Sequence, residues 1–169
     1  MNSKSGKTET DVELSRPSRD GLAVTLYLRS GSSGSVERRQ AALRDRFEAV
    51  RAADRLASAS VERWSPTVVT PVSEADAGMA DALDTYRELS TAVADAGGRL
   101  APFFEVEERR GGLLIGRPEG ERITFPVACL VVRREDAVTG VYPCWLDGTH
   151  HSLEEGLAAL ELGDPENLR

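Results

Sequence analysis

Two cysteines and two histidines near the C-terminal end are the residues best suited to hold a metal ion. Cys129 and Cys144 lie on neighbouring predicted strands, and His150 and His151 follow them closely. If the hairpin turns near Asp136, the thiols are opposite or diagonal and a histidine can return towards them. Two thiolates and an imidazole supply most of a tetrahedral zinc site. The tight Cys-x-x-Cys and His-x3-His spacings are missing, so the alternative is two small buried thiols, two turn histidines and no cofactor.

An arginine-rich segment is a candidate for contact with phosphates. Between Ser35 and Leu56 the chain has six arginines and four acids, a local charge of +2 in an otherwise acidic chain. Nucleic-acid binding requires such local positive charge. Arg38, Arg39 and Arg46 are the predicted contacts. The alternative is a solvated helix face on which arginines pair with acids three or four positions away.

Two further groups have weaker patterns. Glu105 and Glu107 share one face of a predicted strand, and paired carboxylates can divide acid and base roles, but the same alternation fits the solvent side of a strand. The stretch from Arg109 to Gly112, with Gly116 and Gly120, fits a hairpin turn better than an anion-binding loop. The sequence contains no Gly-x-Ser-x-Gly, His-Glu-x-x-His or dinucleotide-binding pattern. We predict that the protein is not an enzyme.

The elements that position these residues form a predicted α+β sandwich with the order β-α-β-α-β-β-β-α. Residues 22–29 alternate apolar and polar side chains, which predicts a strand. A helix is predicted over 36–54, with Leu43, Phe47 and Val50 as its buried stripe. A strand over 59–70, broken near Pro66, follows. The first two strands are expected to be parallel if they are adjacent, joined by the helix as a right-handed crossover.

The rest of the chain is predicted to be one helix, a set of strands and a short last helix. The second helix is expected from about Pro71 to Ala96, ended by two glycines. The chain after this helix is β-rich and is expected to form an antiparallel meander. Its predicted β segments are 100–109, 113–115, 123–133 and 138–146. Ser152 and Glu155 have the spacing of a capping box, which opens the last helix.

Length and composition indicate one domain. The chain has 169 residues, of which 40% are hydrophobic and 29% charged, with a net charge of −7. We place a disordered tail at 1–20, the α+β domain at 21–162 and a short C-terminal tail at 163–169. No apolar run approaches the roughly 20 residues that span a bilayer. A cytoplasmic location without membrane contact is therefore expected.

Five segments of the sequence carry a resemblance to known proteins. They are Val24–Ser30, Leu100–Glu105, Pro126–Leu130, Val141–Cys144 and Ser152–Leu157. These segments resemble a family of small haloarchaeal proteins that are often labelled as helix-turn-helix domain proteins. The likeness extends from about residue 22 to 161, and the label implies DNA binding without supplying catalytic or ligand residues. The arginine-rich composition after residue 20, which includes no lysine, also fits a GC-rich genome and a salt-adapted cytoplasm.

We expect a non-enzymatic regulatory or protein-interaction module of an archaeal, halophilic cytoplasm. It would meet a protein partner or a second copy through a sheet face or through the aromatic residues Phe103, Phe104, Tyr142 and Trp145. The alternative is a DNA-binding transcriptional regulator that uses the arginine-rich helix. A third possibility is a zinc-binding protein that uses Cys129 and Cys144.

Overall fold

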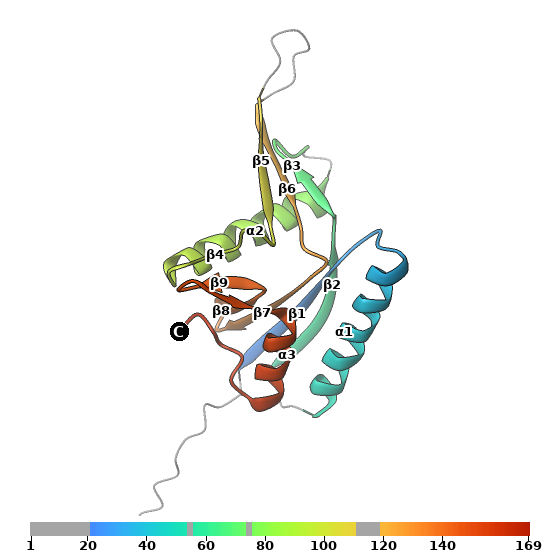
Figure 1. Ribbon diagram of the computed structural model, residues 1–169, viewed down its shortest axis with the longest axis vertical. Helices are drawn as coiled ribbons and strands as arrows, with labels where there is room; N and C mark the ends of the chain where they lie inside the picture. Colours follow the sequence, from blue (N-terminus) through green and yellow to red (C-terminus); the bar gives the residue numbers. More distant parts are fainter. Residues whose placement is uncertain (1–20, 54–55, 74–75, 111–118) are drawn as a thin grey trace, which may run out of the picture.

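The computed structural model describes residues 21–53, 56–73, 76–110 and 119–169 (Figure 1). The predicted N-terminal tail and the predicted strand at 113–115 lie outside these ranges. Within them the chain forms helices and mixed sheets, which confirms the single-domain α+β class.

The central sheet has four strands in the order β2-β1-β7-β8. Strand β1 (Leu22–Arg29) runs parallel to β2 (Ser58–Trp64) and antiparallel to β7 (Ala128–Arg134), which pairs in turn with β8 (Ala137–Tyr142). Helix α1 (Gly34–Ala53) connects β1 to β2. This arrangement confirms the predicted parallel pair and its helical crossover. It also makes β2 and β8 the two edge strands.

Helices cover both faces of this sheet (Figure 1). Helix α1 and helix α3 (Leu153–Leu162) pack on one face, and helix α2 (Ala77–Asp95) packs on the other. The predicted stripe of α1 is confirmed, since Leu43, Phe47 and Val50 are all buried. Burying a side chain of this size contributes about 1.5–3 kcal/mol to folding.

A proline divides the strand that was predicted over 123–133. Strand β6 (Gly120–Thr124) pairs with β3 (Thr67–Val69) and β5 (Glu105–Arg109) in a second sheet, whereas β7 belongs to the central sheet. Pro126 stands between β6 and β7, where the ring removes the amide needed to continue a ladder. The β5–β6 hairpin extends away from the rest of the domain (Figure 1).

The strand predicted over 138–146 is divided in the same way. Pro143 separates β8 from β9 (Cys144–Leu146), which pairs with β4 (Gly98–Arg99) and β10 (Thr149–His151) in a third sheet. The strand predicted over 100–109 is also shorter, because turns occupy the residues between β4 and β5. The expected antiparallel pairing holds, but it is distributed over three sheets.

Capping residues set the observed helix ends. Helix α2 begins later than predicted, because Asp76 caps it and accepts a hydrogen bond from the Met79 amide at 3.0 Å. The predicted capping box of α3 is confirmed, with Ser152 Oγ accepting from the Glu155 amide at 3.1 Å. Of the described helices, none has the length and apolar character needed to cross a membrane.

The last seven residues, predicted as a tail beyond the domain, pack along β8. The Leu168 amide donates to Thr139 O at 3.0 Å. The Asn167 side chain accepts from the Val141 amide and donates to Val141 O, both at 2.9 Å. The carboxylate of Glu166 is almost fully buried, so this segment is anchored by a side chain as well as by its backbone.

Candidate functional site

Two arginines of the predicted basic face of α1 pair with acids of α3. Arg39 Nη2 lies 2.8 Å from Glu154 Oε1, and Arg46 Nε lies 2.7 Å from Glu161 Oε1. Arg46 lowers the pKa of Glu161 through this hydrogen bond. Arg38 is exposed on another side of the helix, and no ion pair joins it to a described residue. Two of the three predicted phosphate contacts are therefore engaged within the protein.

The predicted metal ligands take up separate roles. Cys129 and Cys144 are fully buried in the core beneath α2, and burial raises the pKa of both thiols, that of Cys144 to about 11. His151 Nδ1 lies 3.1 Å from Glu155 Oε1. In the described part of the chain, no cluster of three or more His, Cys, Asp or Glu residues has an arrangement that could hold a metal ion. The four residues thus do not meet as one ligand set.

His150 stands instead in a stack of flat side chains, which we call the His150 stack. Its imidazole lies between the Phe103 ring at 4.9 Å and the Trp145 ring at 5.6 Å, measured between centroids. The Arg99 guanidinium lies 5.4 Å from the Trp145 ring centroid. His150 is exposed, while the Phe103 and Trp145 side chains are half-buried. Phe104 and Tyr142, the other two predicted aromatic contacts, belong to the core.

A small apolar pocket of about 260 Å³ opens beside this stack, between the N-terminal ends of α1 and α3. Most of its wall is aliphatic or aromatic, and the Arg39–Glu154 ion pair lies at its edge. We call it the α1–α3 pocket. Its lining residues are Arg39, Leu43, Phe103, Pro126, Val127, Ala128, Pro143, His150, Ser152, Leu153 and Glu154.

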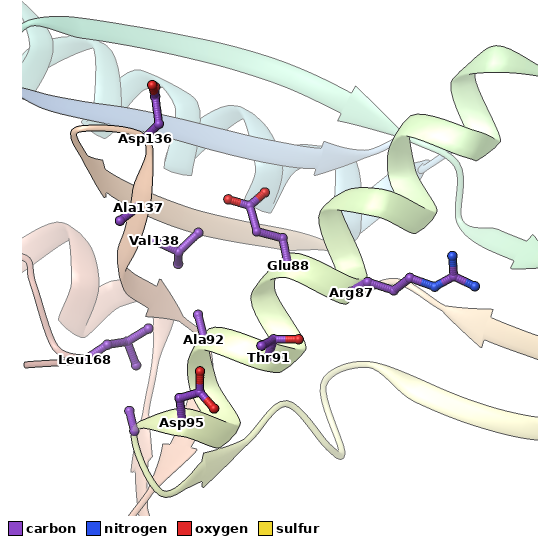
Figure 2. Close-up of a pocket in the computed structure, with 10 residues that line it drawn as sticks. Arg87, Glu88, Thr91, Ala92, Asp95, Asp136, Ala137, Val138 and Leu168 are labelled. Atoms are coloured by element: carbon purple, nitrogen blue, oxygen red, sulfur yellow. The ribbon is translucent and has the colours of Figure 1, made fainter.

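A larger and shallower groove of about 710 Å³ lies between α2 and β8 (Figure 2). Its base contains Ala92, Val138 and Leu168. Glu88 points across the groove and binds Arg133 of β7, with nitrogen to oxygen distances of 3.2 and 3.3 Å. This groove brings together no group of reactive side chains.

The weaker candidates on the β5–β6 hairpin stay apart from these sites. Glu105 and Glu107 are exposed on β5, and no described residue forms a hydrogen bond with either carboxylate. Arg109 ends β5 and Gly120 begins β6. The glycines predicted for an anion-binding loop, from Gly111 to Gly116, lie outside the described residues.

A comparison with known protein families shows to which family the chain belongs. The sequence matches the helix-turn-helix domain family over residues 16–165, which is most of its length. The chain belongs to this family. No curated protein and no solved structure matches it. The family match carries no organism, so the haloarchaeal origin stays a prediction.

The family description and the described helices differ in one respect. A helix-turn-helix unit joins two helices by a turn of about 3–4 residues. Across the described ranges, α1 and α2 are separated by β2 and β3, and α2 and α3 are separated by seven strands. The family name is therefore evidence of relationship, while the observed architecture is an α+β domain.

Four of the five segments that carry the family resemblance contribute to the α1–α3 pocket. Sequence analysis did not identify this pocket, because its walls come from five separate stretches of the chain. Phe103 and His150 were singled out for other reasons, and their contact joins residues far apart in the sequence. A local signal near the pocket is that Pro126 and Pro143 each interrupt an apolar run, and both prolines line the pocket.

Proposed function

We propose that this protein is a non-enzymatic regulatory member of the helix-turn-helix family that acts by binding a peptide segment of a protein partner. The observation that carries the proposal is the α1–α3 pocket with the His150 stack at its rim. A concave apolar site with a few convergent polar groups is the usual form of a binding site. Its size suits a single apolar anchor side chain better than a large cofactor.

The chemistry of the rim favours a neutral partner segment. Arg39 is already neutralised by Glu154, and Glu154 has a lowered pKa because hydrogen bonds from the helix backbone and from Arg39 outweigh its partial burial. An apolar anchor could enter the pocket without breaking this pair. The flat faces of Phe103 and His150 can cover such an anchor, and large aromatic contacts supply much of the energy of protein interfaces.

A peptide library displayed on phage tests this function without a known partner. Recovered peptides are expected to share an aromatic or branched aliphatic anchor residue. Phe103→Ala and His150→Ala should each weaken binding about tenfold or more, with circular dichroism showing an intact fold. Arg87→Ala is the matched control, because Arg87 lines the α2–β8 groove, which lies on the opposite side of the sheet from the α1–α3 pocket (Figure 2). Failure to recover peptides, or peptides that bind both pocket variants like the parent, would reject the proposal.

DNA binding is the second candidate, and the family match favours it. Contact with phosphates predicts an affinity for duplex DNA that falls steeply as salt is raised. Fluorescence anisotropy with a labelled duplex should then show weaker binding for Arg38→Ala, whereas Arg39→Ala would change it less because Arg39 is paired with Glu154. If adding the protein at low salt leaves the anisotropy of the labelled duplex unchanged, DNA binding is rejected. That result does not affect the peptide experiment.

A further inference from the structure

The two edge strands of the central sheet differ in whether other residues cover their outer backbone groups. The outer side of β8 is occupied by Asn167 and Leu168, which hydrogen-bond to Val141 and Thr139. Strand β2 has no such cover, and among the described residues it pairs only with β1. An uncovered edge presents a row of backbone donors and acceptors to any other strand.

The hydrogen bonds of β2 show which backbone groups are directed outward. Trp64 O accepts from the Ser30 amide at 2.9 Å, so the backbone of Trp64 faces β1. By the alternation of a strand, the amides and carbonyls of Ala59, Val61 and Arg63 face away from β1. The strand contains no proline, and the side chains at its start are small, which leaves room for another backbone.

We propose that a second copy of this chain pairs its β2 antiparallel to β2 and makes one continuous sheet across a two-fold axis. Centring the axis on Val61 places Val61 opposite its own copy and Ala59 opposite Arg63 of the other chain. Glu62 then faces Ser60, so no like charges are directly opposed. Because each chain uses the one edge of the central sheet that the described residues leave uncovered, the assembly closes as a dimer.

The side of α1 next to β2 has the charges that such a contact requires. Glu37 and Arg44 lie with Arg63 around a small pocket of about 130 Å³ at this edge, and Glu48 pairs with Arg51 further along the helix at 3.4 Å. Two acids and two arginines on one flank are neutral together and complementary when two helices run antiparallel. The chain as a whole has a net charge of −7, which opposes association of two copies, and a neutral flank at the contact reduces that repulsion.

This inference shares with the proposed function the premise that the protein acts by binding. Here the binding partner is a second copy of the same chain. Light scattering over a wide range of concentration should show the mass rising from 18.3 kDa to twice that value. Ala59→Pro should hold the protein as a monomer, because proline removes an outward amide and is tolerated where that amide does not serve the sheet. Ala59→Val keeps the amide and should dimerise like the parent.

Hydrogen exchange supplies a measurement that needs no variant. The Val61 amide should exchange slowly at high concentration and quickly on dilution, while the Ser60 amide, which faces β1, stays protected at both. A parent protein that is monomeric throughout, an Ala59→Pro variant that still dimerises, assemblies larger than a dimer, or a Val61 amide insensitive to dilution would each overturn the inference. None of these results bears on the peptide experiment at the α1–α3 pocket.

Discussion

The two edge strands of the central sheet differ in what lies beside them, although they belong to the same sheet. Strand β8 is covered by the last residues of the chain, which satisfy its outer backbone groups with the Asn167 side chain and the Leu168 amide. Strand β2 ends the sheet on the opposite side with its outer groups unpaired by described residues. The comparison shows that a few residues outside the regular elements decide which edge of a sheet can meet another chain.

The largest expected effect comes from removing the anchor of the covered edge. Glu166 accepts hydrogen bonds from Arg134 and forms an ion pair with Arg169, while its side chain is only 2% exposed. Glu166→Ala should lower the free energy of unfolding by about 1.5–3 kcal/mol, the range for hydrogen bonds to a charged group. Urea denaturation measures this change. Asp164→Ala is the control, because Asp164 also pairs with Arg169 but is 72% exposed, and it should be nearly neutral.

The same anchor predicts a dependence on pH. Hydrogen bonding from Arg134 lowers the pKa of Glu166 below its usual value near 4.5. A carboxyl group whose pKa is depressed by folding contributes stability that is complete above the unfolded pKa and is lost as the pH falls through the folded pKa. The stability difference between the parent and Glu166→Gln should therefore shrink in acid. An undiminished difference at low pH would show that the charge of Glu166 is unimportant for covering β8.

A smaller effect is expected from the side chain that covers the edge directly. Asn167→Ala removes both hydrogen bonds to Val141 and should cost about 1–2 kcal/mol. Asn167→Asp keeps the acceptor for the Val141 amide and loses the donor to Val141 O. The difference in unfolding free energy between Asn167→Asp and Asn167→Ala should therefore separate the contributions of the two hydrogen bonds. Faster exchange of the Val141 amide in Asn167→Ala would identify the opened edge. Unchanged exchange there would mean that Asn167 does not protect β8.

The smallest effect belongs to the open edge. Glu62→Gln changes an exposed side chain of β2 that has no ion pair with a described residue, and it should alter the free energy of unfolding by less than about 0.5 kcal/mol in dilute protein. Urea denaturation at low concentration is the measurement. A cost comparable to that of Asn167→Ala would show that β2 has intramolecular cover after all, and the contrast between the edges would disappear.

Local patterns predicted the elements whose signals are contained within a few residues. The alternation in β1, the buried stripe of α1 with Phe47 at its centre, and the capping box at Ser152 all involve neighbours in the sequence, and all three are confirmed. The later strands were less well predicted. Apolar runs continue through Pro126 and Pro143, so periodicity alone joined segments that belong to different sheets.

The candidate site was the least accessible to sequence reasoning. Arg39 and Arg46 were predicted to contact phosphates. The only ion-pair partners that the sequence suggested for them were acids on the same helix, whereas their actual partners on α3 are 115 positions away. His150 was predicted to bind a metal because imidazole is a common ligand. Its stacking partner Phe103 lies in the turn between β4 and β5. Spacing within one element does not contain either of these contacts.

By itself, the sequence determined the class of the fold, the first β-α-β unit and the capped start of α3, because these depend on periodicity and on hydrogen bonds within a few residues. Only the tertiary structure decided that Arg39 and Arg46 of α1 pair with acids of α3, that the α1–α3 pocket exists, and that the final residues close one edge of the sheet. Those features depend on which distant segments are brought together by packing on the two faces of the central sheet, and the order of side-chain types along the chain does not specify that juxtaposition.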